Sequence, residues 1–380
     1  MKSNLLFCLL FSLLFSCNNN DKNHFPDVRA LVDTVRIRYV PDRRDDVYEI
    51  TVSACERKPV LRGVTSVSEA KADLLFRLRN MGYDVIDSIR LLPDETVEGF
   101  RNAVANVSVA DLRVKAGHAS EMATQLLLGT PMQLLEKRSG WYRVKTPENY
   151  VAWVQRETVT SMNEETFVQW EAARKIIFTD DYGFAYETTN ENGQRSSDLV
   201  FGNLLKWESD AGRFYNVSYP DARRAYILKA QCQMFDDWEK SICLTEESIV
   251  EKALELKGIP YTWGGTSVKA MDCSGFTKTV FLKHGIMLSR DASQQAKNGI
   301  HVDISDGYDK LRPGDLMFFG TKADDDSHEK IRHVGIYIGN MEFIHAAGYV
   351  HISSLNPAEP HYDEGNTQQF IRARRITINN

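Results

Sequence analysis

A cysteine that follows a glycine-rich stretch is the strongest chemical signal in this 380-residue chain. Cys273 comes after residues 261–265 (YTWGG) and directly after Asp272, and it opens a helical pattern that continues through Lys283. The first turn of a helix has backbone N–H groups without partners, and their positive potential favours a thiolate or an oxyanion. We therefore expect Cys273 to be a nucleophile with a pKa below its ordinary value of about 8.5.

Two histidines downstream of Cys273 are the predicted proton carriers. His333 begins an alternating strand pattern, and His345 lies on the strand that returns after a turn at residues 339–340. Because strand side chains alternate between faces, a two-residue turn there would put the histidines on opposite faces. A three-residue loop, 338–340, would pair them directly. If both histidines serve one thiol, the hairpin must have an odd-numbered loop or a bulge, and we predict that it does.

A catalytic triad follows from this arrangement. His333 would take the proton of Cys273, and His345 would orient the far nitrogen of the His333 ring. The competing interpretation is a zinc site made by His328, His333, His345 and Cys273. No CxxC or HExxH spacing supports zinc, so we expect neither a metal nor an organic cofactor.

Patterns elsewhere indicate a multidomain α+β protein. Residues 28–39 and 47–53 have strand-like, β-branched stretches, and Ser68 begins a helical pattern that ends at Gly82. The predicted inner face of that helix consists of Ala72, Leu75, Leu78 and Met81. Residues 105–160 then contain five short strand patterns separated by turn residues, which favours a small barrel.

The barrel segment resembles a bacterial SH3-like domain. The similar stretches are 112–113, 128–131, 140–144 and 150–154. Residues 161–240 repeat the theme more loosely, which predicts a second, diverged SH3-like barrel. Thr245 then resembles a helix cap and opens the segment that carries the reactive residues.

The N-terminus has the order of a secretory leader. Lys2 precedes an apolar run at residues 5–15, and Ser16 and Cys17 are followed by polar asparagines. This order resembles a bacterial lipoprotein signal, which implies that Cys17 is lipidated and becomes the mature N-terminus. The alternative is a plain signal peptide with a chance cysteine. We expect an exported lipoprotein that is anchored to a membrane and faces the periplasm.

Composition excludes a nucleic-acid partner. The chain has 46 Lys and Arg against 52 Asp and Glu, a net charge of −6, whereas a phosphate-binding face needs a surplus of basic residues. Processing at Cys17 would leave Cys55, Cys232, Cys243 and Cys273 as thiols. Cys232 and Cys243 either pair locally or are buried as small apolar residues.

Residues 244–375 resemble the NlpC family of cell-wall cysteine peptidases. The shared stretches are YTWGG at 261–265, DCSG at 272–275, RPGDL at 312–316, HVGIYIG at 333–339 and FIHA at 343–346. The resemblance implies a papain-like fold and a triad of Cys273, His333 and His345. It also implies hydrolysis of the bond between γ-linked D-glutamate and a diamino acid in murein peptides.

This resemblance completes the expected organisation. The segments are a lipoprotein signal peptide (1–17), a tether with a small α+β domain (18–104), an SH3-like barrel (105–160), a second, diverged SH3-like barrel (161–240) and a papain-like catalytic domain (244–380). We expect the protein to act as a monomer on a murein peptide.

Some family members carry SH3-like domains ahead of the catalytic domain, and this chain resembles that subgroup. The subgroup implies a substrate with a free N-terminal L-alanine. Its amine would pair with an acidic residue that matches Glu121 and an aromatic residue that matches Tyr150. Asp272 and Ser274 match substrate-contacting positions, and Tyr261 matches a tyrosine beside the thiolate.

One position departs from the family pattern. The family often has Ser or Thr soon after the arginine that matches Arg290, whereas residues 291–293 are Asp-Ala-Ser here. The residue that receives the D-glutamate carboxylate therefore stays open. Two other functions also stay open: an amidase or acyltransferase of the same fold that acts on another amide or a lipid, and a non-catalytic wall-binding lipoprotein. The intact Cys273 and both histidines argue against the second.

Overall fold

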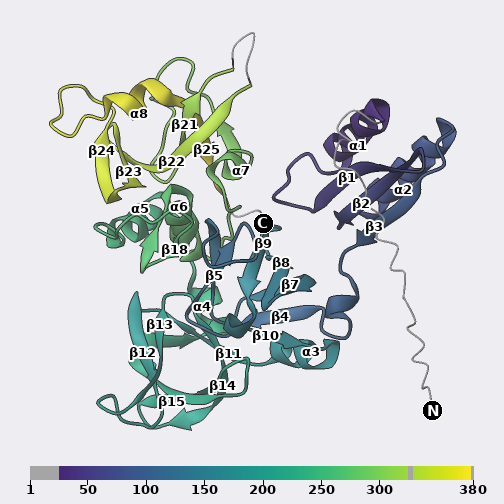
Figure 1. Ribbon diagram of the computed structural model, residues 1–380. Helices are drawn as coiled ribbons and strands as arrows, with labels where there is room; N and C mark the ends of the chain where they lie inside the picture. The colour runs from purple at the N-terminus through teal and green to yellow at the C-terminus, as the bar shows by residue number, and fades with distance from the viewer. Residues whose placement is uncertain (1–24, 324–327, 378–380) are drawn as a thin grey trace, which may run out of the picture. The chain divides into compact units, whose positions relative to one another are not determined.

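The computed structural model describes residues 25–323 and 328–377. They form two compact units, one ending at Leu92 and the other beginning at Pro93 (Figure 1). The predicted signal peptide, Cys17 included, and most of the predicted tether lie outside the described residues. Within the described ranges, no helix has the length and apolar character needed to cross a membrane.

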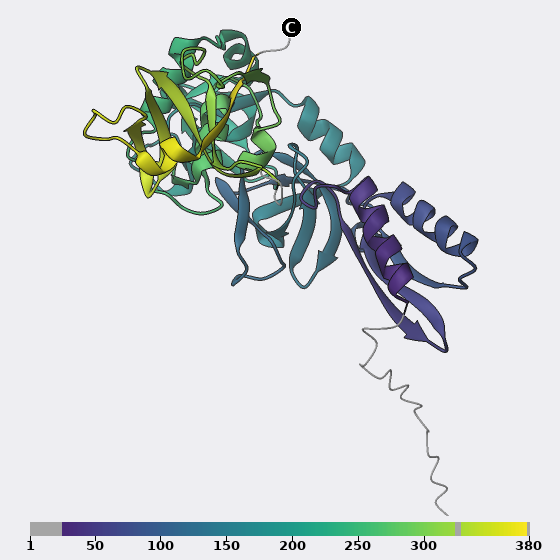
Figure 2. The same cartoon turned by 90° about the horizontal axis from the view of Figure 1, so that it is seen from above.

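The first unit is a small α+β domain. Its elements are α1 (Pro26–Tyr39), β1 (Tyr48–Cys55), β2 (Lys58–Thr65), α2 (Ser68–Asn80) and β3 (Ile86–Leu91). Strands β1 and β2 are antiparallel, whereas α2 is the crossover that brings β3 parallel to β2. Helices α1 and α2 pack side by side over the sheet (Figure 2).

The prediction of a strand at residues 28–39 is wrong, because this segment is helix α1. Val28, Val32 and Val35 are buried on one face of the helix, at the spacing of a 3.6-residue period. Pro26 stands in the first turn, where its missing N–H costs no hydrogen bond. The apolar period, rather than the β propensity of valine, decides the conformation.

Helix α2 confirms the predicted helix but only part of its predicted inner face, because Leu78 is buried and Leu75 packs against the same core. Ala70, Leu74 and Leu78 are buried, whereas Ala72 and Met81 are exposed. The buried set is spaced four residues apart and packs in the same core as α1. The sheet and α1 therefore select which face of α2 turns inward.

An SH3-like barrel opens the second unit. Its elements are the 3-10 helices η2 (Glu95–Val97) and η3 (Arg156–Thr158) and the strands β4 (Asn102–Ala105), β5 (Val109–Arg113), β6 (Met122–Leu127), β7 (Pro131–Arg138), β8 (Trp141–Lys145), β9 (Val151–Gln155) and β10 (Val159–Met162). Their order is β10-β4-β7-β8-β9-β5-β6. The five predicted strand patterns, at 107–109, 112–114, 132–135, 141–144 and 150–154, do not include strand β6, because its sequence MATQLL favours helix. Pairing with β5 makes it extended.

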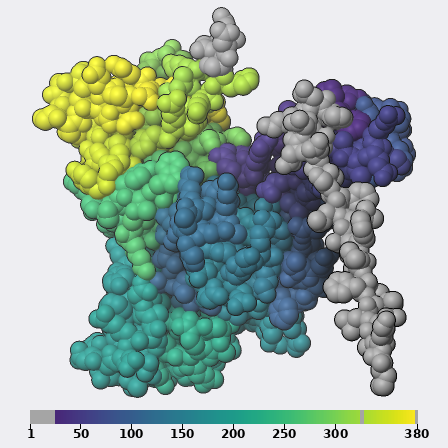
Figure 3. Space-filling view, in the orientation of Figure 1, coloured from purple at the N-terminus to yellow at the C-terminus, as the bar shows by residue number. Residues whose placement is uncertain are grey.

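A second SH3-like barrel follows. Its elements are α3 (Glu164–Ala172), β11 (Lys175–Phe178), β12 (Tyr182–Tyr186), β13 (Arg195–Val200), β14 (Leu204–Ala211), β15 (Phe214–Ser218), β16 (Arg224–Leu228), the 3-10 helix η4 (Lys229–Gln231), β17 (Cys232–Met234) and α4 (Phe235–Ser241). The strand order is β13-β12-β16-β15-β14-β11-β17. The blue surface of the first barrel adjoins the teal surface of the second (Figure 3).

The papain-like catalytic domain completes the unit. Its helices are α5 (Glu246–Glu255), α6 (Cys273–Leu282), α7 (Ala292–Gln295) and α8 (Glu364–Gln369). Its strands are β18 (Thr266–Ser267), β19 (Ala270–Met271), β20 (Ile300–Val302), β21 (Leu316–Thr321), β22 (Lys330–Gly339), β23 (Glu342–Ala347), β24 (Tyr349–Ser354) and β25 (Phe370–Arg375). The main sheet has the order β20-β25-β21-β22-β23-β24. Thr245 and Ser248 form a capping box that begins α5, as the predicted cap requires.

The cysteines of the described residues are free thiols. Cys232 is buried at the end of the second barrel, whereas Cys55 and Cys243 are exposed. Cys232 therefore matches the prediction of a buried apolar residue. For Cys243 both alternatives are wrong, because it neither pairs with Cys232 nor lies in a core.

Helix α6 is pressed against both the sheet and its own leading loop. Phe276, Val280 and Phe281 share a core with Val334 and Ile336 of β22. On the loop side, a Cβ atom added to Gly275 would lie 2.0 Å from the carbonyl oxygen of Gly265. Only glycine permits this approach. The start of the helix is therefore held at a fixed distance from the loop before it.

Gly275→Ala is expected to destabilise the second unit by about 1–3 kcal/mol, because the added methyl group must push the loop away from α6. Gly117→Ala is the matched control, since nothing lies within 4 Å of a Cβ atom there. Thermal unfolding of both variants measures the difference. Equal melting temperatures would contradict the close approach.

Candidate active site

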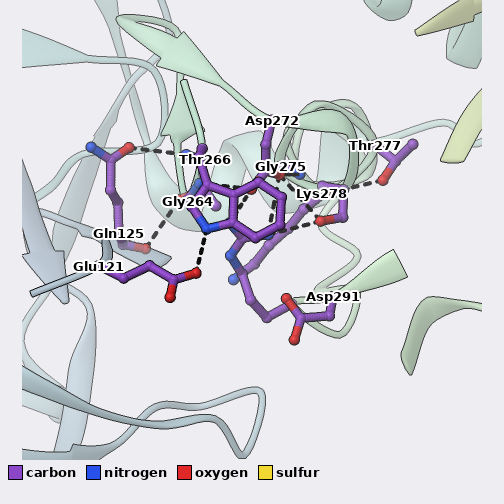
Figure 4. Close-up of polar contacts among 12 residues, drawn as sticks. Glu121, Gln125, Gly264, Thr266, Asp272, Gly275, Thr277, Lys278 and Asp291 are labelled. Carbon is purple, nitrogen blue, oxygen red and sulfur yellow. Dashed lines mark hydrogen bonds and ion pairs between the residues drawn. The ribbon is translucent and has the colours of Figure 1, made fainter. Parts of the chain in front are cut away.

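Asp272 determines where helix α6 begins and hence where Cys273 lies. Its backbone is extended, with φ −88° and ψ −177°, and it is the N-cap of the helix. One carboxylate oxygen accepts a hydrogen bond from the N–H of Gly275 at 2.7 Å, and the other accepts one from the N–H of Gly264 at 2.9 Å (Figure 4). This capping leaves Cys273 as the first helical residue, which confirms the predicted helix start.

A buried arginine completes the surroundings of Asp272. The side chain of Arg290 is 1% exposed and forms an ion pair with Asp272 at 2.5 Å. Its Nη1 atom also donates to Ser274 Oγ at 2.8 Å. The side chains of Asp272 and Ser274 are thus engaged inside the protein, and their predicted contact with substrate stays a prediction.

Burial dominates the electrostatics of the thiol. Burial and then the Asp272 carboxylate raise the pKa of Cys273 to about 12, although the backbone N–H groups of Val334 and Ser274 and the charge of Arg290 act in the opposite direction. The expectation of a lowered pKa is therefore wrong, because desolvation outweighs the helix terminus. At neutral pH the group is a thiol and needs a base to become a nucleophile.

The two predicted histidines are hydrogen-bonded to each other. His333 Nε2 lies 2.7 Å from His345 Nδ1. His333 is half-buried, and His345 is 1% exposed. The N–H of Val334, the residue after His333, hydrogen-bonds the sulfur of Cys273. The cysteine therefore lies against the part of β22 that carries His333.

A bulge puts both histidines on one face, as predicted. Ile336 pairs with Ile344, but the register shifts before Gly339 pairs with Glu342, so Ile338 is the extra residue. The other predicted alternative, a three-residue loop that pairs the histidines directly, does not form. His345 lies beside Gly335, where an added Cβ atom would be 3.1 Å from His345 Cβ. The histidines are diagonal neighbours, and glycine leaves the space that their contact requires.

Burial also keeps both imidazoles neutral. It lowers the pKa of His333 to about 4, although the carboxylates of Asp363 and Asp272 raise it, and the neighbouring His351 lowers it further. Burial and then His333 and His351 lower the pKa of His345 to about 2. A neutral imidazole can accept a proton, so the site holds a thiol together with an unprotonated base.

The first barrel supplies polar groups beside this site. Glu121 Oε1 accepts a hydrogen bond from the indole N–H of Trp263 at 2.7 Å (Figure 4), and Trp263 is 63% exposed. The Tyr150 hydroxyl donates to Asp291 at 3.3 Å. Tyr261 has a pKa raised to about 12 by burial and then by Cys273 and Asp272, which places it next to the thiol.

Two further contacts attach the barrel to the catalytic domain. Gln125 accepts from the N–H of Thr266 at 2.9 Å, and its carbonyl oxygen accepts from the Thr266 hydroxyl at 3.1 Å (Figure 4). Lys278 of α6 forms an ion pair with Glu148, and their side chains are 12% and 3% exposed. The first barrel is therefore part of the wall around the start of α6.

Sequence reasoning missed Ser353, which lies 3.0 Å from His345 Nε2, and the contact between Trp263 and Glu121. Ser353 is two residues after His351 and lies on the same face of the strand. A strand prediction at 349–354 would therefore have placed Ser353 near His345. His328, from the predicted zinc alternative, is exposed. Among residues 25–323 and 328–377, no group of His, Cys, Asp or Glu side chains is arranged to hold a metal ion.

Comparison with known protein families finds one match in the catalytic domain and one in the first barrel. The NlpC/P60 family matches residues 258–375. The chain belongs to the NlpC/P60 family and is a cysteine peptidase. The bacterial dipeptidyl-peptidase Sh3 domain matches residues 112–159, within the first barrel.

The sequence matches between this NlpC/P60 peptidase and its named relatives differ in length. A gamma-D-glutamyl-L-lysine dipeptidyl-peptidase of Bacillus cereus is 29% identical over 269 residues, 68% of this chain and 76% of that protein. The murein DD-endopeptidase MepS/murein LD-carboxypeptidase of Escherichia coli K12 is 34% identical over 152 residues, 39% of this chain and 72% of that protein. A crystal structure of an NlpC/P60 family protein from Bacillus cereus has the same fold, with a TM-score of 0.61, 24% identity and coverage of 72% of this chain and 99% of that one.

The ion pair between α6 and the first barrel affects the stability of this NlpC/P60 peptidase. Burial alone would raise the pKa of Glu148, but the ammonium of Lys278 lowers it below the ordinary value of 4.5. The pair therefore stabilises the protein above that pH, and the stabilisation is lost as the pH falls.

Lys278→Met is expected to destabilise the second unit by about 3–5 kcal/mol, because the carboxylate of Glu148 stays buried without its partner. Adding Glu148→Gln to that variant is expected to recover most of the loss. Lys310→Met removes an exposed pair with Asp303 and is expected to have a much smaller effect, because solvent screens it. Chemical denaturation measures each variant. A double variant that is no more stable than Lys278→Met would contradict the cost of the unpaired carboxylate.

Peptidase activity is expected to persist below the ordinary histidine pKa of 6.5 and to fall only as the pH approaches about 4, because His333 must be neutral to accept a proton. His351→Gln removes a group that lowers the pKa of His333, so the acid limb should move to higher pH. The measurement is kcat/KM against pH, with circular dichroism to verify folding at each pH. An acid limb centred on 6.5 in both proteins would refute the effect of burial.

Proposed function

We propose that the protein hydrolyses the bond between γ-linked D-glutamate and a diamino acid in murein peptides that carry a free N-terminal L-alanine. The observation that carries this proposal is the thiol of Cys273 at the start of α6, bonded to the N–H next to His333, which is itself paired with His345. Relatives named gamma-D-glutamyl-L-lysine dipeptidyl-peptidase support a peptidase of peptidoglycan peptides.

The proposed reaction is acyl transfer through a thioester. Because His345 occupies Nε2 of His333, Nδ1 of His333 is the nitrogen left for the proton of Cys273. The sulfur attacks the γ-carbonyl carbon, and N–H groups of the first turn of α6 stabilise the oxyanion. His333 then returns the proton to the leaving amine as the C–N bond breaks. Water hydrolyses the thioester and releases the L-alanyl-D-glutamate product.

The free-amine requirement rests on Glu121. Its carboxylate is exposed, and the indole N–H of Trp263 holds one oxygen. The other oxygen is available to an ammonium group, which it would bind by a charge-assisted hydrogen bond. The exposed residue Trp263 belongs to the loop that leads to Cys273, so an amine at Glu121 would lie near the reacting bond. Tyr150 is proposed as the aromatic partner in this site.

A second candidate is cleavage of murein itself, because the Escherichia coli relative is named murein DD-endopeptidase MepS/murein LD-carboxypeptidase. That match spans 152 residues, little more than the catalytic domain, whereas the Bacillus cereus match spans 269. The longer match exceeds the 118 residues from 258 to 375 that match the NlpC/P60 family and extends beyond the catalytic domain. The barrel contacts the segment before α6 through Gln125 and Thr266, and in this proposal its position beside Cys273 favours short peptides over large murein.

We also propose that the protein is exported, lipidated at Cys17 and held at a membrane facing the periplasm, where it acts as a monomer without a cofactor. The support is the order of the leader: a basic residue, an apolar run at 5–15, Ser16 and Cys17. Such an anchor would keep the enzyme close to murein fragments.

The purified protein is expected to release L-alanyl-D-glutamate from L-Ala-γ-D-Glu-diaminopimelate, and Cys273→Ala is expected to be inactive. Glu121→Gln should raise KM about ten- to a hundredfold for this substrate, because a hydrogen bond to a charged group is lost. Glu98→Gln, which changes another exposed glutamate of the second unit, is the matched control. Product is measured by mass spectrometry.

Two results would argue against this function. Equal turnover by Cys273→Ala would defeat the cysteine mechanism. Equal cleavage of the N-acetylated substrate, or an unchanged KM in Glu121→Gln, would remove the role of the free amine. Preferred cleavage of cross-linked murein would support the second candidate.

A further inference from the structure

The histidine pair continues into a third side chain. His345 Nδ1 faces His333, and its other ring nitrogen, Nε2, lies 3.0 Å from Ser353 Oγ. Ser353 stands on the neighbouring strand β24, where Phe343 pairs with Ser353 and His345 pairs with His351. Because alternate residues share a face, His345, His351 and Ser353 all lie on the face that carries His333.

The two hydrogen bonds of His345 decide which of its nitrogens carries hydrogen. To take a proton on Nδ1, His333 must have its own hydrogen on Nε2. His345 Nδ1 must then be the acceptor of that hydrogen, because a single hydrogen occupies the contact. A neutral imidazole carries one N–H, so the hydrogen of His345 must be on Nε2. The other tautomer would leave the base without a free position for the thiol proton.

The N–H on His345 Nε2 needs a buried acceptor. His345 is 1% exposed and Ser353 is 5% exposed, so bulk water does not reach the contact. The ring of His351 covers His345, with centroids 4.5 Å apart. His351 Nδ1 donates to the carbonyl oxygen of Tyr349 at 2.9 Å, which holds that ring in place. An N–H buried here without an acceptor is costly.

We propose that Ser353 is a positioning residue that keeps the hydrogen of His345 on Nε2 and thereby lets His333 act as the base for Cys273. The proposal rests on the proposed function, because it assigns a role within the same site. Ser353 touches neither substrate nor the reacting atoms and acts through His345. Its hydroxyl accepts the hydrogen bond from Nε2–H, and this bond opposes the tautomer that would block His333.

The test compares Ser353→Ala with wild type and with Ser353→Thr, which keeps a hydroxyl. Nitrogen chemical shifts of ¹⁵N-labelled histidine rings report the tautomer of His345. Alkylation of Cys273 by iodoacetamide at neutral pH, followed on its tryptic peptide, reports how well the base activates the thiol and needs no peptide substrate. Steady-state kinetics with L-Ala-γ-D-Glu-diaminopimelate supply kcat and KM separately.

Ser353→Ala is expected to give a mixture of His345 tautomers, about tenfold slower alkylation and about tenfold lower kcat with KM unchanged, the effect of one lost buried hydrogen bond. Ser353→Thr is expected to restore each value at least in part. Ser354→Ala is the matched control: Ser354 is also buried, but its hydroxyl bonds the backbone of Met341 and Asn356. It should leave the tautomer and the alkylation rate unchanged.

Three outcomes would overturn the proposal. The first is a wild-type His345 with its hydrogen on Nδ1. The second is a Ser353→Ala variant with wild-type kcat and alkylation. The third is a loss of kcat in Ser353→Ala with an unchanged tautomer, which would indicate a merely structural role. If wild type does not cleave the peptide, the substrate assignment fails, while the tautomer and alkylation measurements still decide the role of Ser353.

Discussion

The carboxylate of Asp272 is the interaction on which the site depends. It caps α6 through Gly275, holds the preceding loop through Gly264 and pairs with the buried guanidinium of Arg290. A single buried charge thus joins a loop, a helix start and the segment before α7. Because a buried ion pair that loses one partner leaves an uncompensated charge, these parts hold one another in place. Cys273 takes its position from this network.

Burial explains why the site uses a base. The thiol of Cys273 and the imidazoles of His333 and His345 are all shifted toward their neutral forms, chiefly by desolvation. Charge separation before substrate binds would cost free energy in this environment. A proton transfer between adjacent neutral groups avoids that cost until the reaction begins. For the activation of Cys273, the ring nitrogen that carries the hydrogen in His333 and in His345 therefore matters more than the resting charge of either imidazole.

The first barrel is an integral part of the catalytic unit. Thr266, in the segment before α6, donates two hydrogen bonds to Gln125 of the barrel, and the ion pair of Glu148 and Lys278 is buried between the two domains. These contacts place Glu121 beside Trp263, on the loop that leads to the nucleophile. If Glu121 binds the substrate amine as proposed, it would set the register of a peptide on one domain against the thiol on another.

The sequence by itself determined the local features: the helix that begins at Cys273, the cap of α5 and, from strand parity together with the expectation that both histidines serve one thiol, an odd-numbered loop or a bulge between them. Each depends on residues close together in the chain. Tertiary structure decided which face of α2 turns inward, that the Cys273 pKa is raised, and that His345 contacts Ser353. These outcomes depend on burial and on contacts between elements, which no local pattern records. Glu121 and Trp263 are 142 positions apart, and only packing of the barrel against the catalytic domain brings them together.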